Sequence, residues 1–215
     1  MVTVRHHTFL DKICLGFDQA LKALTHDIQT TGSPYPAESA GEADLSAAES
    51  ALSAGLMRVN HTGEVCAQAL YHGQALVTRH APLQAQLQAA ALEEGDHLYW
   101  CKRRLDELQS YTSYLNPLWY AGSFCIGAVA GVVGDDWSLG FVVETEKQVI
   151  NHLEGHLKRL PVNDVRSAAI LKQMEQDEAH HRDEAKAAGA RELPPPIKVL
   201  MRMMSKVMVK TVYYV

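Results

Sequence analysis

Hydrophobic residues recur along most of this chain at the three- and four-residue spacing of an amphipathic helix. No long stretch alternates polar and apolar residues with a period of two, so β-strands are not expected. Pro, Gly and Asn interrupt the helical pattern at a few points. The pattern predicts an all-α protein with helices over residues 8–30, 46–79, 82–110, 136–160 and 164–188, and a last helix after residues 194–196.

Residues 117–134 differ from the rest of the chain because they carry no charged side chain. This glycine-rich segment falls just short of the roughly 20 apolar residues that span a bilayer. It therefore predicts a segment that is buried against other helices or faces a membrane. We divide the chain into an N-terminal helix (1–30), a linker (31–45) that begins with Thr31-Gly-Ser-Pro-Tyr-Pro, and a main domain (46–215).

Composition narrows the class of function before any motif is considered. The chain has 215 residues, of which 47% are hydrophobic and 21% charged, the balance of an ordinary globular protein. Its net charge of −5 disfavours nucleic acid as a partner. Its four cysteines lie far apart without a C-x-x-C pair, which disfavours a zinc ribbon or a disulfide scaffold. The 11 histidines are numerous for this length, so metal ligation has to be considered.

Glutamates and histidines form the same pattern twice along the main domain. In each half, a lone glutamate on one predicted helix is followed by a Glu-x-x-His on the next helix. The first half consists of Glu64, Glu94 and His97, and the second of Glu146, Glu178 and His181. Positions i and i+3 share one face of a helix, so each Glu-x-x-His offers a carboxylate and an imidazole to one metal ion.

These six side chains match the ligand set of a di-iron or di-manganese site in a ferritin-like four-helix bundle. Four carboxylates cancel the charge of two divalent ions, and carboxylate and imidazole ligands suit iron or manganese. Glu94 and Glu146 share helix faces with apolar residues, where an ionised carboxylate is costly unless it is paired or binds a metal. A single Glu-x-x-His is common on solvated helices, so it is the duplication that favours metal binding.

Other polar residues are candidates for a supporting role. Glu93 and Asp177 each precede the glutamate of a Glu-x-x-His, so each can accept the second N–H of the opposite histidine. An ordinary solvated carboxylate is an equally good interpretation of both. His61 and His152 are candidates for a supporting or proton-handling role, whereas surface or hydrogen-bonded core positions suit two further histidines better, His156 and His180.

Six motifs follow one another along the chain: Arg58-Val-Asn-His-Thr-Gly-Glu-Val, Glu94-Gly-Asp-His-Leu, Asn116-Pro-Leu-Trp-Tyr-Ala-Gly-Ser-Phe, Glu146 within Glu-Thr-Glu-Lys-Gln-Val, Asp177-Glu-Ala-His-His and Leu193-Pro-Pro-Pro-Ile-Lys. Their sequence, order and spacing resemble the demethoxyubiquinone hydroxylase family of ubiquinone biosynthesis. The resemblance covers nearly the whole chain from about Ala48 onward. The additional N-terminal helix and linker look like the bacterial branch of that family.

The resemblance implies a ferritin-like fold with additional N-terminal, hydrophobic and C-terminal helices. It implies an oxidoreductase, an O2-dependent monooxygenase with two iron ions (Fe2+) per chain. The substrate would be 2-polyprenyl-3-methyl-6-methoxy-1,4-benzoquinol (demethoxyubiquinol), hydroxylated on its ring late in ubiquinone biosynthesis. The implied ligands are Glu64, Glu94, His97, Glu146, Glu178 and His181, with Glu94 and Glu178 as the bridging carboxylates. His152 matches a family histidine near the site, whose role stays open.

The polyprenyl tail of that substrate implies contact with a membrane surface. The last predicted helix aligns Lys198, Arg202, Lys206 and Lys210 beside an apolar stripe, which favours an interfacial helix. A helix that only closes the bundle is the alternative, and the uncharged run 118–133 is a second candidate for the contact. We expect peripheral attachment at the cytoplasmic face of the bacterial cell membrane. A reductase or a ubiquinone-pathway complex is a further expected partner.

Other classes of function share part of this pattern. A ferritin-like iron storage or detoxification protein would use the same ligands, but it would need neither the uncharged segment nor the basic last helix. Another di-iron enzyme, such as a quinol oxidase or a peroxidase, would oxidise its substrate without hydroxylating the ring. A bundle whose carboxylates are merely solvated would bind no iron.

Overall fold

The computed structural model describes residues 9–25, 28–41 and 44–215 of the chain. In these ranges it contains seven helices and no strand, which confirms the all-α prediction. The helices are α1 (Phe9–Leu24), α2 (Ala47–Val77), α3 (Ala81–Glu107), α4 (Asn116–Val133), α5 (Asp135–Leu157), α6 (Val165–Ala187) and α7 (Pro195–Val212). The parts of the predicted N-terminal helix and linker at 1–8, 26–27 and 42–43 lie outside the described residues.

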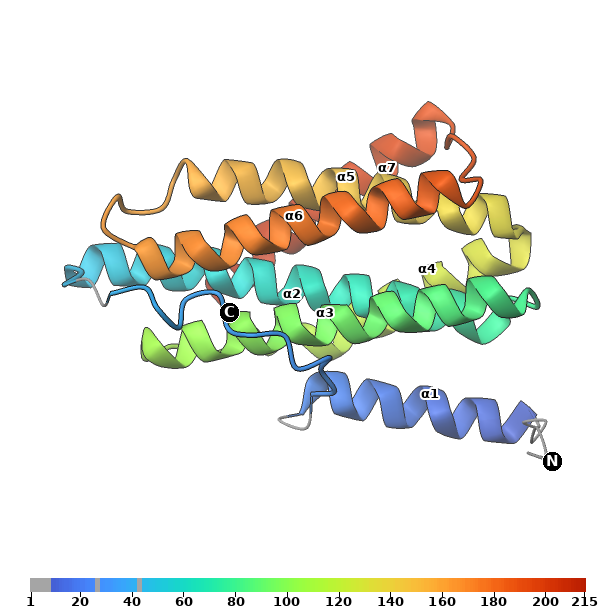
Figure 1. Cartoon of the computed structure of the whole chain (residues 1–215), viewed down its shortest axis with the longest axis horizontal. Helices are drawn as coiled ribbons and strands as arrows, with labels where there is room; N and C mark the ends of the chain where they lie inside the picture. Colours follow the sequence, from blue (N-terminus) through green and yellow to red (C-terminus); the bar gives the residue numbers. More distant parts are fainter. Residues whose placement is uncertain (1–8, 26–27, 42–43) are drawn as a thin grey trace.

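Four long helices, α2, α3, α5 and α6, run along the long axis of the molecule (Figure 1). α2 packs along α3 and α5 packs along α6, and the two pairs meet through α3 with α6 and α2 with α5. The start of α2 is fixed by a capping box, in which the Ser46 side chain accepts the Glu49 N–H while the Glu49 carboxylate accepts the Ser46 N–H. The result is a four-helix bundle that carries three additional helices.

The first predicted helix is shorter in the structure than in the prediction. It ends at Leu24 instead of residue 30, and residues 28–32 are not helical and lie across α3. Gly95 makes this crossing possible, because a Cβ atom there would lie 1.8 Å from the carbonyl oxygen of Gln29. The backbone N–H groups of Thr31 and Gly32 then donate to the Asp96 carboxylate, each at 3.3 Å. Periodicity alone does not reveal this competing contact.

The uncharged segment forms α4, which packs more extensively against α2 than against any other helix. Glycines bring the two backbones together, since a Cβ at Gly127 would lie 2.2 Å from the Leu70 carbonyl oxygen. A Cβ at Gly73 would lie equally close to the carbonyl oxygen of Phe124. Elsewhere on its surface, α4 exposes apolar side chains, among them Leu118, Val129, Val132 and Val133. Among the described residues, α4 is the one helix long and apolar enough to cross a membrane.

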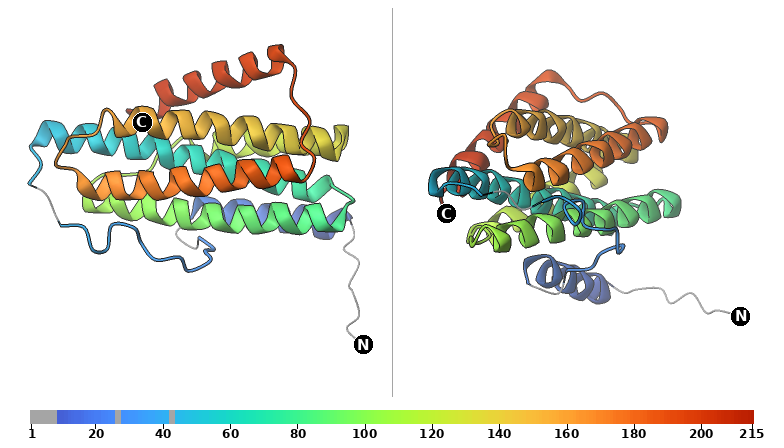
Figure 2. Two further views of the ribbon diagram at one scale, coloured as in Figure 1. Left: turned by 45° about the horizontal axis from the view of Figure 1, so that its top comes forward. Right: turned by 60° about the vertical axis from the view of Figure 1, so that its left-hand side comes forward.

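α7 lies outside the bundle and crosses over α5 (Figure 2). Its C-terminal end is fixed to α2, because Arg58 donates a 2.6 Å hydrogen bond to the Tyr213 carbonyl oxygen. The Tyr213 ring also covers Gly55, where a Cβ would approach it to 2.6 Å. The middle of α7 exposes Leu200, Met203 and Val207 to solvent. α4 and α7 therefore both present several apolar side chains on the outside of the bundle.

Candidate metal centre

The four long helices each contribute to one buried cluster of glutamates and histidines. The lone glutamates Glu64 and Glu146 come from α2 and α5, and the two Glu-x-x-His pairs come from α3 and α6. Each of the six side chains is at most 4% exposed. Ionised carboxylates at such depth are costly unless a partner or a cation neutralises them.

The two Glu-x-x-His pairs face one another at the centre of the cluster. His97 Nδ1 lies 3.1 Å from Glu94 Oε2 and 3.2 Å from Glu178 Oε1. His181 Nδ1 lies 3.3 Å from Glu178 Oε2 and 3.5 Å from Glu94 Oε1. Glu94 and Glu178 thus lie between the two imidazoles.

The lone glutamates flank this central group. Glu64 Oε2 lies 3.8 Å from His97 Nδ1, and oxygen or nitrogen atoms of Glu64, Glu94, His97 and Glu178 all lie within 4.8 Å of one another. Glu146 accepts a hydrogen bond from the buried hydroxyl of Tyr71 and lies on the side of His181. Among the described residues, Glu64, Glu94, His97 and Glu178 form a group that could hold a metal ion. Glu146 and His181 lie beside this group and are not part of it.

The outer nitrogen of each histidine contacts a carboxylate of the opposite helix pair. His97 Nε2 lies 3.2 Å from Asp177 Oδ2, and His181 Nε2 lies 2.8 Å from Glu93 Oε2. Gln173 donates to the other oxygen of Asp177 at 2.9 Å. These contacts orient both rings with Nδ1 toward the cluster, which is the arrangement by which carboxylates orient metal-ligating histidines.

The glutamate oxygens test whether the cluster fits a metal. Each of the four glutamates has one buried oxygen without a hydrogen-bond partner in the protein. Buried polar atoms are rarely left unpaired, so four such oxygens in one cluster call for a ligand. Divalent cations that prefer oxygen and nitrogen donors satisfy them, and two such ions neutralise four carboxylates. The residues therefore fit a dinuclear metal centre.

The pKa values of the cluster show how the metal-free protein tolerates it. Burial raises the pKa of Glu64 and of Glu146 well above the usual range. For His97 and His181, hydrogen bonds to carboxylates outweigh burial, and the pKa of His181 rises to about 12. Glu94 is the opposite case, because its contacts with both histidines lower its pKa despite burial. The two glutamates and the two histidines with raised pKa values therefore have to release protons when metal binds.

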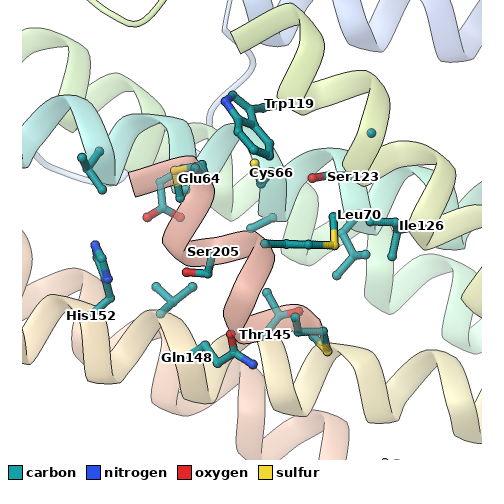
Figure 3. Close-up of a pocket in the computed structure, with 18 of the residues that line it drawn as sticks. Glu64, Cys66, Leu70, Trp119, Ser123, Ile126, Thr145, Gln148, His152 and Ser205 are labelled. Carbon is teal, nitrogen blue, oxygen red and sulfur yellow. The ribbon is translucent and has the colours of Figure 1, made fainter. Parts of the chain in front are cut away.

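A cavity of about 370 Å³ lies beside the cluster on the side of α2 and α5. Its other walls come from α4 and α7, and most of its lining is apolar. Glu64 is the member of the cluster that reaches it. Figure 3 shows the Glu64 carboxylate and the His152 ring pointing toward the same part of this cavity, with Trp119 and Ile126 on the α4 side. A small apolar ligand in the cavity would therefore lie next to the cluster.

The structure separates the histidines that the sequence left as candidates. His152 lines the cavity, and burial lowers its pKa. His61 forms no hydrogen bond with the six cluster residues. It accepts a 3.3 Å hydrogen bond from Asn116, and burial lowers its pKa to about 4. His180 is exposed on α6. His156 is a hydrogen-bonded core residue, because its Nδ1 lies 2.7 Å from Asn60 Oδ1.

Two residues that contact the site carry no marked signal in the sequence. Tyr71 follows Glu64 by two helical turns, so the spacing places both on one face of α2 but does not show that the hydroxyl meets Glu146. Asn60 precedes Glu64 by one turn and lines the cavity. Both roles follow from contacts between helices. The residue pattern within one helix does not predict such contacts.

The chain is similar to known proteins along nearly its whole length. The family model described as "Ubiquinone biosynthesis protein COQ7" matches residues 51–212. A protein named 3-demethoxyubiquinol 3-hydroxylase from Acinetobacter baylyi is 52% identical over 99% of this chain and 100% of its own length. Proteins of the same name from Nitrosospira multiformis and Polynucleobacter necessarius are each 55% identical. They cover 96% and 95% of this chain and 99% and 98% of their own lengths.

Among solved structures, a dodecameric thioferritin related to bacterioferritin from Bacteroides fragilis has a similar fold. The TM-score is 0.53 at 17% sequence identity, and the match covers 72% of this chain and 89% of the thioferritin chain. At this level of identity the similarity concerns the fold alone. It confirms the prediction of a ferritin-like bundle.

Proposed function

The chain belongs to the COQ7 family of ubiquinone biosynthesis proteins, and we propose that it hydroxylates the ring of demethoxyubiquinol beside a di-iron centre. Its relatives carry the name 3-demethoxyubiquinol 3-hydroxylase, so the enzyme is an oxidoreductase that adds oxygen to that ring. One observation carries the proposal: Glu64 belongs both to the buried cluster and to the lining of an apolar cavity. An oxygen-activating centre and a site for a neutral ring thus share a wall.

Six side chains would hold two iron ions: Glu64, Glu94, His97, Glu146, Glu178 and His181. Glu94 and Glu178 lie between the two imidazoles, so both would be ligands at the middle of the group. When bound, the iron ions supply the activation of O2 and the electrons for its reduction. The electrons themselves would come from a reductase or another protein of the ubiquinone pathway.

The chain's own residues keep this centre in place. Asp177 and Glu93 accept the outer N–H of the two histidines and so fix which nitrogen faces the metal. The Tyr71 hydroxyl, whose pKa burial raises well above the usual range, stays protonated and holds one oxygen of Glu146. The other oxygen of Glu146 is left for the metal.

The cavity would orient the substrate. Its polar groups Asn60, Glu64 and His152 would surround the ring, while the walls from α4 and α7 would contact the polyprenyl tail. Apolar side chains of this kind exclude water, which protects the reacting ring and strengthens its polar contacts. The substrate would enter between α4 and α7, where the exposed apolar side chains lie.

We propose that the same two helices attach the enzyme peripherally to the cytoplasmic face of the bacterial membrane. α4 is held along α2 by close backbone contacts at Gly73 and Gly127, which favours a helix that lies on the bilayer over one that crosses it. α7 adds exposed basic side chains at Arg202 and Lys206 beside exposed apolar ones. A basic and apolar helix of this type binds anionic lipid surfaces.

Vesicle binding tests the membrane contact. The charge reversals Arg202→Glu and Lys206→Glu should each weaken binding to vesicles with anionic lipid several-fold, since a basic residue near such a surface contributes about 1 kcal/mol. Vesicles of neutral lipid should show little difference between variant and parent. Unchanged binding to anionic vesicles would remove α7 from the contact.

A single turnover with labelled oxygen tests the reaction. The protein is loaded with ferrous iron without oxygen, mixed with a short-chain demethoxyubiquinol and then exposed to 18O2. We expect one labelled oxygen on the ring by mass spectrometry. Oxidised iron with an unmodified ring would instead favour iron storage or quinol oxidation, and a sizing column would distinguish the two because storage requires a cage.

A further inference from the structure

One wall of the cavity carries polar side chains that are not among the six proposed metal ligands. Asn60 and His152 line it from α2 and α5, and Asn60 is 3% exposed. Asn60 and Glu64 are one turn apart, so they share a face of α2. His152 Nε2 is buried and has no hydrogen-bond partner in the protein. A buried nitrogen without a partner is costly, and at the wall of a cavity it points to a ligand that pairs with it.

His156 lies against both of these residues. Its Nδ1 lies 2.7 Å from Asn60 Oδ1, and its ring meets the His152 ring edge-on with centroids 4.1 Å apart. Asn60 Nδ2 lies 3.9 Å from the sulfur of Met57, a weak acceptor. The Asn60 carbonyl oxygen therefore faces His156, and the His156 N–H donates to it. Burial lowers the pKa of His156 to about 3, so the ring is neutral and keeps that one N–H.

We propose that Asn60 and His152 bind the oxygen substituents of a quinol or quinone ring, and that His156 is the positioning residue that fixes both. This inference rests on the proposed function and adds the groups that orient the ring. Because the Asn60 carbonyl oxygen is occupied by His156 and Met57 offers its amide group only a weak sulfur acceptor, an amide N–H of Asn60 remains to donate to a ring oxygen. The unpaired Nε2 atom of His152 offers the ring a second polar contact.

The chemistry of the cavity selects this class of ligand. Glu64 is the one Asp, Glu, Lys or Arg side chain among the residues that line it, and burial lowers the pKa of His152, which favours the neutral ring. A ligand with a formal charge would lose its hydration without a countercharge to replace it. A neutral aromatic ring with hydroxyl, oxo or methoxy groups matches neutral donors and acceptors within apolar walls.

Binding to the iron-free protein tests the head-group contact without any turnover. The probe is a benzoquinone with a ten-carbon tail, followed by quenching of tryptophan fluorescence, since Trp119 lines the cavity. Asn60→Leu and His156→Leu should each weaken binding about 3- to 10-fold, the value of one hydrogen bond. His156→Gln keeps an N–H donor and should recover most of the affinity. His180→Leu, at an exposed position on α6, is the matched control and should bind like the parent.

Turnover of the iron-loaded enzyme gives a second readout. A ring held in the wrong orientation should leave O2 consumption intact while less oxygen reaches the ring and more hydrogen peroxide is released. His156→Leu should show this uncoupling, with unchanged iron content, and His156→Gln should reverse it. A residue with a merely structural role would lower stability without changing the ratio of peroxide to product.

Quinone affinity and coupling at the parent level in both Asn60→Leu and His156→Leu would overturn the inference. If circular dichroism shows that His156→Leu does not fold, Asn60→Leu and His156→Gln decide the question, because Asn60 itself lines the cavity. The proposed function fails separately. A wild-type enzyme that forms no hydroxylated ring, but binds the quinone in a manner that depends on Asn60, would refute the reaction and keep the head-group site.

Discussion

The two sides of the glutamate and histidine cluster differ in chemistry. On the α3 and α6 side, His97 and His181 meet the partly exposed carboxylates of Asp177 and Glu93, against which lies a cavity of about 480 Å³ with a mixed polar and apolar lining. On the α2 and α5 side, Glu64 meets an apolar cavity that α4 and α7 close. One side of the centre therefore communicates with polar surroundings, and the other faces a space that disfavours water.

Histidines on the two sides show what this difference does. Carboxylates raise the pKa of both ligand histidines against the effect of burial, with Asp177 as the largest contributor for His97 and the cluster glutamates Glu178 and Glu94 for His181. Burial lowers the pKa of His152 and His156 on the apolar side. The same residue type thus holds a proton on one side of the metal-free centre and remains neutral on the other.

Removal of one metal ligand should abolish both iron binding and hydroxylation of the ring. His97→Ala deletes an imidazole that lies within 3.2 Å of Glu94 and Glu178 oxygens. We expect loss of bound iron and a fall in hydroxylation of more than about 100-fold, larger than the effect of outer partners of metal ligands. Iron analysis, product mass and circular dichroism measure this outcome. The control His180→Ala, at an exposed position, should keep iron, and a fully active His97→Ala would exclude His97 as a ligand.

Protonation of His156, on the apolar side, should make the stability of the folded protein depend on pH. Its pKa is about 3 in the folded protein and about 6.5 in the unfolded chain, so the unfolded state binds an extra proton between these values. Stability from this group is present above pH 6.5 and is lost as the pH falls toward 3.

Glutamine does not titrate, so His156→Gln should lose about 2 kcal/mol less stability than the parent between pH 7 and pH 5. Urea unfolding of the iron-free proteins at the two pH values measures this difference. Equal pH dependence in parent and variant would show that His156 takes up a proton in the folded state.

The repeated Glu and Glu-x-x-His pattern made the ligand candidates predictable, because helix periodicity alone aligns residues i and i+3. Six of the seven helices in the described residues were predictable for the same reason, with the end of α1 as the largest difference, whereas periodicity did not predict α4. After α1 the chain crosses α3 at Gly95, which is a contact between distant segments. Local pattern does not contain such contacts.

The surroundings of the centre were less predictable than its ligands. Glu93 and Asp177 had two equal interpretations in the sequence, and only the placement of α3 against α6 brings them to the histidines. Asn60 and His156 lie 96 positions apart, so their hydrogen bond follows from the packing of α2 on α5. The apolar cavity needs four helices at once and has no signature in any one of them.

A change on the polar side should weaken metal binding without affecting the ring. Asp177→Asn keeps an oxygen near His97 Nε2 but removes the negative charge that strengthens this contact. We expect about 10-fold weaker iron binding, the lower end of the range for such partners. Quinone affinity of the iron-free protein should stay unchanged, because the cavity lies on the other side. Asp183→Asn at an exposed site on α6 is the control, and a change in quinone affinity in Asp177→Asn would break the distinction between the two sides.

A change on the apolar side should do the reverse. Gly122 lines the cavity from α4, and a Cβ atom there would meet nothing within 4 Å. Gly122→Phe should therefore place its ring at the mouth of the cavity and raise KM for the quinol about fivefold, with iron content unchanged.

The smaller substitution isolates the backbone effect from the cavity effect. Gly122→Ala should raise the free energy of unfolding by about 0.5–1 kcal/mol, because glycine is a poor helix former, and should leave KM near the parent value. Gly155→Ala on α5 has similar free space and lies outside the cavity lining, so it should show the same stabilisation. Stabilisation at both positions, with a KM effect confined to Gly122→Phe, would locate substrate access at α4. A normal KM in Gly122→Phe would mean that the quinol reaches the centre by a path that does not pass Gly122.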